Sequence, residues 1–397
     1  MKAVVSGMIA TFPLGGVAWD YGQYALGLER LGYEVTYLED TGVPSYSRDP
    51  ASGLYREDPS DGIEFLRSSL ARLSPTLALR WHVRAADGTT YGMALAALLD
   101  TLAEADVLIN VSGSCLLRPE YRRAVRRAIF IDTDPGWNHL VILPRWDEKP
   151  PLEREMGFRG HDAHFTYAGR LGAADCPLPD LGLAWRPTRP PVVVDEWSAE
   201  PSTGRWTTVT MWGNYLDTVQ HGGRTYGSKD IEFRRFEDVP QRTSAQLELA
   251  IYGDPQRSTH FGDAPRERWR EMGWSVINGA DVSASLDDYR GYIERSRGEF
   301  SVAKNVYVDT RSGWFSCRSV CYLAAGLPVV LQDTGWSHLY PAGEGLLAFD
   351  SVATAAAALN AVEADYERHA ASAAQLVREH FDARTVLEEL VEQAVSA

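Results

Sequence analysis

Short apolar runs alternate with stretches of helical periodicity from the first residues onward. Residues 2–9 form a β-branched run, and Gly15 and Gly16 break the pattern after it. Apolar side chains then recur every three or four positions over residues 21–31, and residues 33–38 form the next strand-like run. A strand, a helix and a second strand in this order predict a unit with parallel strands.

The same alternation continues along the chain, with one interruption. Residues 177–205 are rich in proline and predict an extended segment at a domain boundary. The pattern on both sides of this segment predicts two α/β halves, each with a parallel sheet covered by helices on both faces. Further strands are predicted at residues 107–111, 128–131, 206–212, 247–252, 300–302 and 328–331, further helices at 287–296 and 320–325, and mostly helix from residue 352.

Length and charge narrow the class of protein. A chain of 397 residues is long enough for two domains, and its formal net charge of −15 disfavours nucleic-acid binding, because acidic surfaces repel phosphate backbones. The sequence contains no run of 18 apolar residues, so no membrane span is predicted. The four cysteines lack the spacing of zinc sites. The only lysines are Lys2, Lys149, Lys229 and Lys304, a bias that alone carries little structural information. We therefore expect a cytoplasmic protein.

The loop after the first strand is one candidate site, because open parallel sheets bind ligands beyond the carboxyl ends of their strands. Gly15 and Gly16 allow tight turns at the start of a helix, although the G-x-G-x-x-G dinucleotide fingerprint is absent. Asp20, which we expect in the first helical turn, either serves as a base or complements the helix dipole. Trp19 either stacks on a sugar or packs in the core.

A second candidate loop is Asp132-Thr133-Asp134-Pro135-Gly136-Trp137, which follows an apolar strand. Asp132 or Asp134 could accept a hydroxyl proton as general base. The alternative is that one carboxylate caps the next turn while the other is solvated. Trp137 is a candidate for contact with an acceptor. No further acidic or histidine ligand stands nearby in the sequence, so a metal pair is not expected here.

Cations gather in the sequence around a third group of loops. Lys304 and Arg318 both lie in strand–loop–helix contexts, and Arg318 follows Ser316 at the predicted start of a helix. A guanidinium beside a helix N-terminus suits a diphosphate, because its planar fork and the free backbone N–H groups both donate to phosphate oxygens. The alternative for either cation is a salt bridge at the surface or between domains.

Two polar turns complete the candidates. Asp333, Thr334 and Gly335 follow the strand predicted at residues 328–331, where they could touch a sugar donor. Glu344 lies between Gly343 and Gly345 and could bind hydroxyl groups or cap a turn.

The C-terminal half resembles the "glycosyl transferases group 1" domain of the GT-B glycosyltransferases. Its stretch from Arg318 to Val330, RSVCYLAAGLPVV, is similar to R-x-x-E-x-L-A-x-G-x-P-V-V, and Asp333-Thr-Gly335 and GEGLLAFD follow it. LELAIYGD, which ends on Gly253 and Asp254, resembles the strand of the nucleotide-binding domain.

This resemblance implies a GT-B fold, with two Rossmann-like domains whose parallel sheets face an interdomain cleft. The implied domains are an acceptor-side domain at residues 1–203, a nucleotide-sugar-binding domain at 204–376, and a helix at 377–397 that returns to the first domain. The family's layout implies that Lys304 and Arg318 bind the donor diphosphate and that the loop with Asp132 and Asp134 lies near the acceptor.

One departure from the family concerns its Glu-x7-Glu pair, which would occupy positions Gly313 and Cys321 here. The second glutamate of that pair holds the donor ribose in the family, so the ribose contact and the stereochemistry of transfer are left open.

The sequence thus predicts a metal-independent glycosyltransferase that moves a sugar from a nucleoside diphosphate sugar to a small-molecule hydroxyl. The nucleotide sugar would be a co-substrate, and no other cofactor is expected. Two alternatives are a GT-B-type nucleotide-sugar epimerase and a non-catalytic protein that binds sugar nucleotides. The oligomeric state is left open, with a homodimer as one alternative.

Overall fold

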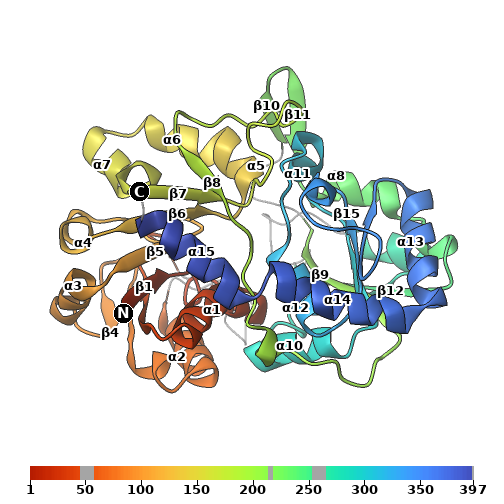
Figure 1. Cartoon of the computed structure of the whole chain (residues 1–397), viewed down its shortest axis with the longest axis horizontal. Helices are drawn as coiled ribbons and strands as arrows, with labels where there is room; N and C mark the ends of the chain where they lie inside the picture. The colour runs from red at the N-terminus through yellow and green to blue at the C-terminus, as the bar shows by residue number, and fades with distance from the viewer. Residues whose placement is uncertain (45–57, 213–217, 253–264, 396–397) are drawn as a thin grey trace. The chain divides into compact units, whose positions relative to one another are not determined.

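A computed structural model describes residues 1–44, 58–212, 218–252 and 265–395 (Figure 1). The chain forms two compact units. The first comprises residues 1–167, 180–193 and 383–397, and the second comprises residues 168–179 and 194–382. The chain therefore passes between the units at four places, whereas the sequence suggested one passage near residue 203 and one return near residue 377.

The first unit is built on an eight-stranded sheet with the order β4-β3-β2-β1-β5-β6-β7-β8. All neighbouring strands are parallel except the pair β3 and β4. Every residue of β5 and β6 is buried, as expected for central strands covered on both faces. The strands are β1 (Lys2–Ser6), β2 (Glu34–Glu39), β3 (Trp81–Arg84), β4 (Thr90–Gly92), β5 (Val107–Val111), β6 (Ala128–Asp132), β7 (Ala163–Thr166) and β8 (Trp185–Pro187).

Helices flank this sheet, and the last helix of the chain, α15, packs on the first, α1 (Figure 1). Gly27 makes the close approach feasible, because a Cβ there would lie 2.6 Å from Leu387 and 2.8 Å from Ala383. The helices are α1 (Gly15–Arg30), α2 (Ser60–Leu73), α3 (Leu95–Glu104), α4 (Pro119–Ala124), α5 (Pro135–Trp137), a π-helix (Asn138–Ile142), α6 (Leu143–Asp147), α7 (Pro151–Met156) and α15 (Ala383–Val395).

The second unit contains a six-stranded, wholly parallel sheet with the order β13-β12-β9-β14-β15-β16. Numbered within the unit, this is the order 3-2-1-4-5-6 of dinucleotide-binding folds, so the strand order reverses between β9 and β14. The strands are β9 (Arg205–Met211), β12 (Gln246–Tyr252), β13 (Ser275–Asn278), β14 (Gly298–Ser301), β15 (Val329–Gln332) and β16 (Leu346–Phe349).

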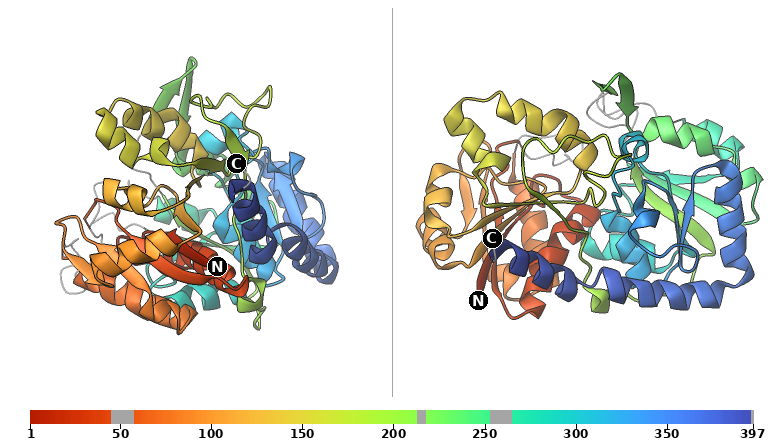
Figure 2. Two further views of the ribbon diagram at one scale, coloured as in Figure 1. Left: turned by 60° about the vertical axis from the view of Figure 1, so that its left-hand side comes forward. Right: turned by 45° about the horizontal axis from the view of Figure 1, so that its top comes forward.

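Helices cover both faces of this second sheet, and a separate hairpin of β10 and β11 follows β9 (Figure 2). The two α/β units with parallel sheets confirm the predicted fold class. The remaining elements are β10 (Thr218–His221), β11 (Arg224–Gly227), α8 (Lys229–Phe233), α9 (Arg266–Glu271), α10 (Leu286–Glu294), α11 (Asn305–Thr310), α12 (Cys317–Ala324), α13 (Val352–Ala364) and α14 (Tyr366–His380).

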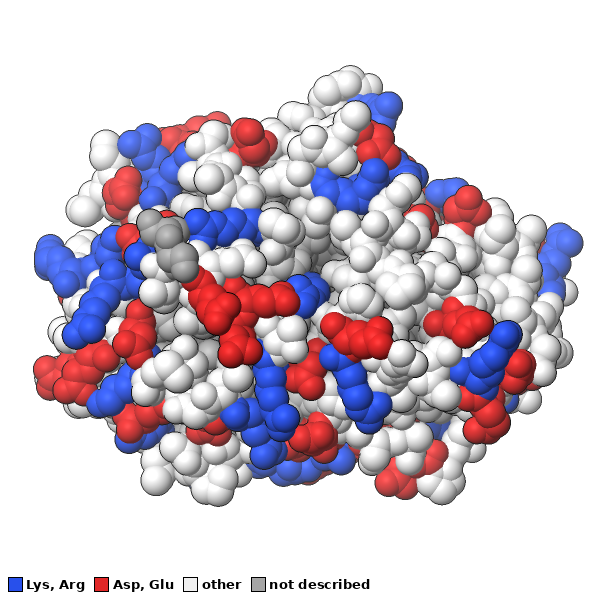
Figure 3. Space-filling model, viewed as in Figure 1, with Lys and Arg blue, Asp and Glu red and all other residues white. Residues whose placement is uncertain are grey.

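Acidic and basic side chains are interspersed over the face shown in Figure 3. In the described parts of the chain, no helix is long and apolar enough to cross a bilayer.

Candidate functional site

The Arg318 side chain lies where the strand order of the second sheet reverses. It is the second residue of α12, and its guanidinium donates to the Val209 carbonyl of β9 (2.8 Å) and to Glu299 Oε1 (2.6 Å) and Ser301 Oγ (2.6 Å) of β14. Burial lowers the pKa of Arg318, but the charge and hydrogen bond of Glu299 together with the nearby Tyr289 and Tyr322 raise it overall. Three of the five guanidinium N–H groups thus donate to described residues of the unit, and the other two could donate to a ligand.

Two lysines lie within electrostatic reach of this arginine. Lys229 is half-buried at the start of α8, and Lys304 precedes the first residue of α11. Burial lowers the pKa of Lys229 well below its usual value, and the charges of Arg318 and Lys304 lower it further. Among the described residues, no carboxylate forms an ion pair with the Lys229 ammonium, although the charge of Glu299 acts against the lowering of its pKa. This cluster of three cations favours an anionic ligand.

A buried polar network holds the segments that carry both lysines. Glu232 of α8 accepts hydrogen bonds from Asn305 Nδ2 (2.9 Å) and Gln332 Nε2 (2.6 Å). Gln332 in turn accepts from the backbone N–H of Ala303, and Asn305 accepts from that of Gly227. The network connects β15 with α8 and α11, so it fixes the backbone on both sides of Lys304 and immediately before α8.

Four of the predicted donor residues build local structure at this edge. Ser316 caps α12 by accepting the Arg318 backbone N–H, and the buried Thr334 hydroxyl donates to the Trp314 carbonyl. Asp333 accepts from the backbone of Gly335 and Ser337. Gly335 has φ +93°, and a Cβ there would lie 2.8 Å from Arg170 Nη1. Ser316 therefore shapes the start of α12, whereas Asp333, Thr334 and Gly335 shape the turn after β15 and tie it to Trp314.

The structure does not bring Glu344 to this edge. Glu344 lies two residues before β16, and since all six strands are parallel it lies at the amino ends of the sheet, opposite the carboxyl ends. Its exposed carboxylate pairs with Arg368 of α14 at 3.3 Å. Gly253, another predicted donor residue, lies outside the described residues.

In the first unit, Asp132 is a fully buried hydrogen-bond acceptor at the end of β6. Its Oδ1 accepts from the Asp134 backbone (3.2 Å) and Asn138 Nδ2 (2.6 Å). Its Oδ2 accepts from Thr166 Oγ1 (2.7 Å) and lies 3.0 Å from His139 Nε2, which is also fully buried. Each oxygen of Asp132 therefore has two partners, and the carboxylate orders the turn that follows β6.

Asp134 lies in the turn that Asp132 orders and remains half-buried. Next to it, the hydroxyls of Thr133 and Ser112 are hydrogen-bonded at 2.6 Å, which joins the loops after β5 and β6. Ser112 has φ +60°, a conformation that costs free energy in a residue other than glycine and that clusters at functional sites. Trp137 is only 3% exposed, and its indole N–H has no partner among the described residues.

The remaining predicted residues belong to α1. The helix begins at Gly15 instead of residue 21, so Asp20 is half-buried in its second turn and not in the predicted first turn. Gly15 is buried and Gly16 half-buried at the helix N-terminus. Trp19 is 1% exposed and packs in the core.

Sequence reasoning missed Lys229 and Glu39. Two of the chain's four lysines lie in the cationic cluster, so the scarcity of lysine was the available signal. Glu39 ends β2 as Asp132 ends β6, and the same rule of a carboxylate at a strand end would have found it. Within the described residues, no group of three or more His, Cys, Asp or Glu side chains is arranged to hold a metal ion.

Known proteins resemble the chain in two ways. Residues 234–392 match the family model described as "Glycosyl transferase-like", which confirms the resemblance of the C-terminal half. No curated protein sequence matches the chain.

Solved structures are similar over the full length. Anabaena Alr3699/HepE in complex with UDP and glucose is 12% identical, with a TM-score of 0.55 and 100% of both chains covered. An alpha-glucosyltransferase in complex with UDP and a 13-mer DNA is also 12% identical, with a TM-score of 0.53 and 100% of this chain and 99% of that chain covered. The C-terminal region thus matches a glycosyltransferase family model, and the whole chain shares the fold of solved GT-B structures.

Proposed function

We propose that the protein transfers a sugar from a nucleoside diphosphate sugar to a hydroxyl group of a small-molecule acceptor. The observation that carries this proposal is the cluster of Arg318, Lys229 and Lys304 at the point where the second sheet reverses its strand order. Ligands of open α/β sheets bind at this point, and a cluster of cations there favours a diphosphate. UDP in similarly folded structures supports the same choice of donor.

The cluster would act on the leaving group. As the bond between the sugar and the diphosphate breaks, negative charge grows on the diphosphate, and fixed cations stabilise that charge more than they stabilise the bound donor. Lys229 suits this role because its ammonium is held without a carboxylate partner, so its charge is available to the incoming anion.

We assign the proton transfer to the loop after β6. A base must reach the acceptor hydroxyl with a carboxylate oxygen, and both oxygens of Asp132 are occupied by internal donors. Asp134, which is half-buried in the turn that Asp132 orders, is our first candidate, with Asp132 as the residue that positions it. Asp20 on α1 is the second candidate.

Calorimetric titration with UDP, GDP, dTDP and ADP tests the donor site. We expect one of them to bind the wild-type chain and Lys229→Met to weaken that binding about 10- to 100-fold, as for loss of a hydrogen bond to a charged group. Lys149→Met is the matched control, because Lys149 is an exposed lysine of the first unit. Equal affinity in wild type and Lys229→Met would refute the assignment.

Arg318→Ala is a poorer test, because it leaves Glu299 buried without its countercharge and so destabilises the unit. The transfer itself is tested by incubating the bound sugar nucleotide with and without hydroxylated acceptors. Mass spectrometry should find the sugar on an acceptor. Conversion of the donor without any acceptor would instead indicate the epimerase.

A further inference from the structure

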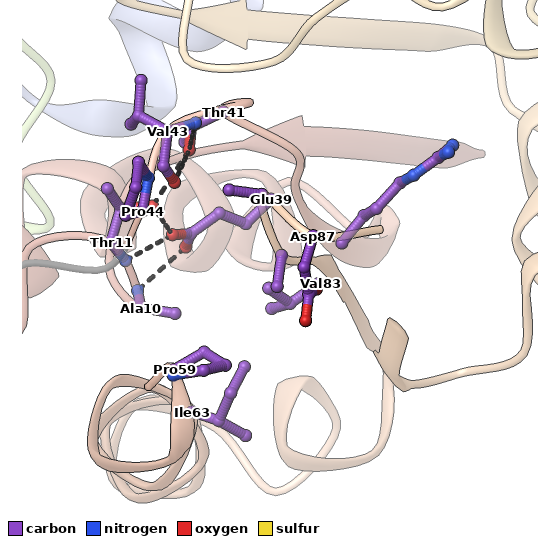
Figure 4. Close-up of a pocket in the computed structure, with 13 residues that line it drawn as sticks. Ala10, Thr11, Glu39, Thr41, Val43, Pro44, Pro59, Ile63, Val83 and Asp87 are labelled. Carbon is purple, nitrogen blue, oxygen red and sulfur yellow. Dashed lines mark hydrogen bonds between the residues drawn. The ribbon is translucent and has the colours of Figure 1, made fainter. Parts of the chain in front are cut away.

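A cavity of about 200 Å³ opens in the first unit at the carboxyl ends of β1, β2 and β3. Figure 4 shows Pro59 and Ile63 on one side of it and Ala10, Thr11 and Glu39 on the other. Sites for drug-sized ligands begin at about 300 Å³, so this cavity suits a single ring or a group of similar size. Its place at the carboxyl edge of an open sheet is where such folds bind ligands.

Glu39 builds the wall of the cavity and does not project into it as a free carboxylate. Its Oε1 accepts from the Thr11 backbone (2.5 Å) and hydroxyl (2.6 Å), and its Oε2 accepts from the Ala10 backbone (2.9 Å) and Tyr37 Oη (3.0 Å). Burial raises its pKa, and the four donors oppose that rise. The bonds fix the loop after β1, so that side of the cavity is rigid.

The rest of the lining is mostly apolar, and an acidic side chain lies at the solvent-exposed end of the cavity. Ile63 and Val83 present aliphatic surface, and Asp87 is exposed after β3, where the Thr89 backbone N–H lowers its pKa. Arg84 is the one basic residue among the described lining residues, and it pairs with Glu120 at 3.3 Å. The lining therefore has an unbalanced negative charge, which disfavours anionic ligands.

We propose that this cavity is an acceptor subsite that takes a ring-sized apolar group bearing a neutral or cationic substituent and excludes anionic ones. The proposal rests on the proposed transferase function. It names an acceptor because the cationic cluster that suits the donor diphosphate lies entirely in the second unit, whereas this cavity lies in the first.

Three probes with the same hydroxyphenyl ring test the chemistry: tyramine, which is cationic, tyrosol, which is neutral, and 4-hydroxyphenylacetate, which is anionic. Saturation-transfer NMR on the full chain should detect tyramine and tyrosol and not the anion. Ile63→Trp fills the cavity and should weaken both contacts about tenfold or more. Leu79→Trp, at a site 81% exposed and outside the lining, is the matched control and should leave them unchanged.

Asp87→Asn is a second variant at an exposed position, so it should fold, and it should reduce the preference for tyramine over the anion. Absence of signal from all three probes, wild-type binding by Ile63→Trp, or equal binding of tyramine and 4-hydroxyphenylacetate would each overturn the proposal. Nucleoside diphosphate binding, measured in the same samples, separates the two ideas. If a diphosphate binds but the probes do not, only the proposed subsite is refuted. If the probes bind but no diphosphate does, the proposed transferase function is refuted.

Discussion

In the first unit, Glu39, Asp40 and Asp132 lie at or next to the carboxyl ends of strands, and donors of the same unit occupy their oxygens. Glu39 and Asp132 each accept four hydrogen bonds, and Asp40 pairs with Arg118 and accepts from Tyr121. In the second unit the corresponding groups are cations, and Lys229 has no carboxylate partner among the described residues. The named carboxylates of the first unit are thus paired within that unit. The cations of the second unit could instead bind an anionic ligand.

This difference implies different roles for the charged residues at the carboxyl ends of the two sheets. A buried carboxylate with all its donors is part of the scaffold, and its removal should damage stability. A half-buried cation without a counterion lowers the stability of the free protein. Binding of an anion raises that stability again. The largest expected effects therefore distinguish residues of the first unit that stabilise its fold from those that act in the reaction. The smaller effects concern the cations of the second unit.

Asp134→Asn should lower kcat about 100- to 10,000-fold, the usual contribution of a general base. The melting temperature should stay close to that of the wild type, because Asp134 is half-buried and its backbone remains bonded to Asp132. Steady-state kinetics with a fixed donor measure the effect. Wild-type kcat in Asp134→Asn would transfer the role of base to Asp20, whose Asn variant is the parallel test.

Asp132→Ala should destabilise the first unit by about 3–5 kcal/mol, the range for breaking a buried ionic pair. The variant removes the acceptor of four donors, including fully buried His139. Urea unfolding measures the loss, and Asp100→Ala on the exposed face of α3 serves as control. If Asp132→Ala unfolds at the wild-type urea concentration but loses activity, Asp132 would be a catalytic residue and not part of the scaffold.

The sequence predicted these folds well where strands are buried on both faces. The apolar runs of β5, β6 and β12 were recognised within one residue at each end, because such strands are continuously apolar. The other strands were missed, namely β3, β4, β7, β8, β13 and β16 and the hairpin β10–β11. β8 is a three-residue edge strand inside the proline-rich segment, and it depends on pairing with β7, which the sequence does not show.

The site was predictable to a similar degree. Arg318 and Lys304 stand next to recognisable strands and helices, so their position was inferred from the order of elements. Lys229 was missed because the hairpin separates it from the end of β9, so it does not follow a strand directly. The role of Asp132 depends on Thr166 and His139, which converge only through the pairing of β6 with β7 and the turn after β6.

Lys229→Met should stabilise the free protein while weakening diphosphate binding. The pKa of Lys229 is lowered in the native state from 10.5, so the unfolded chain binds more protons, and wild-type stability rises with pH between the lowered value and 10.5. The gain from Lys229→Met should be largest at pH values below the lowered pKa, decrease as the pH rises and vanish above 10.5. Thermal unfolding should show a rise of about 2–4 °C for each kcal/mol gained.

The smallest expected effect is proton uptake on diphosphate binding. The bound anion favours protonated Lys229 and raises its pKa, so at a pH between the free and bound values the complex takes up a fraction of a proton. Calorimetry at several pH values from 8 upward, in buffers of different ionisation enthalpy, measures it, because phosphate groups with a second pKa of about 6 are already ionised there. Uptake should disappear in Lys229→Met and persist in Lys149→Met. Uptake that survives in Lys229→Met would mean that another group titrates with the ligand and that the Lys229 ammonium does not face the diphosphate.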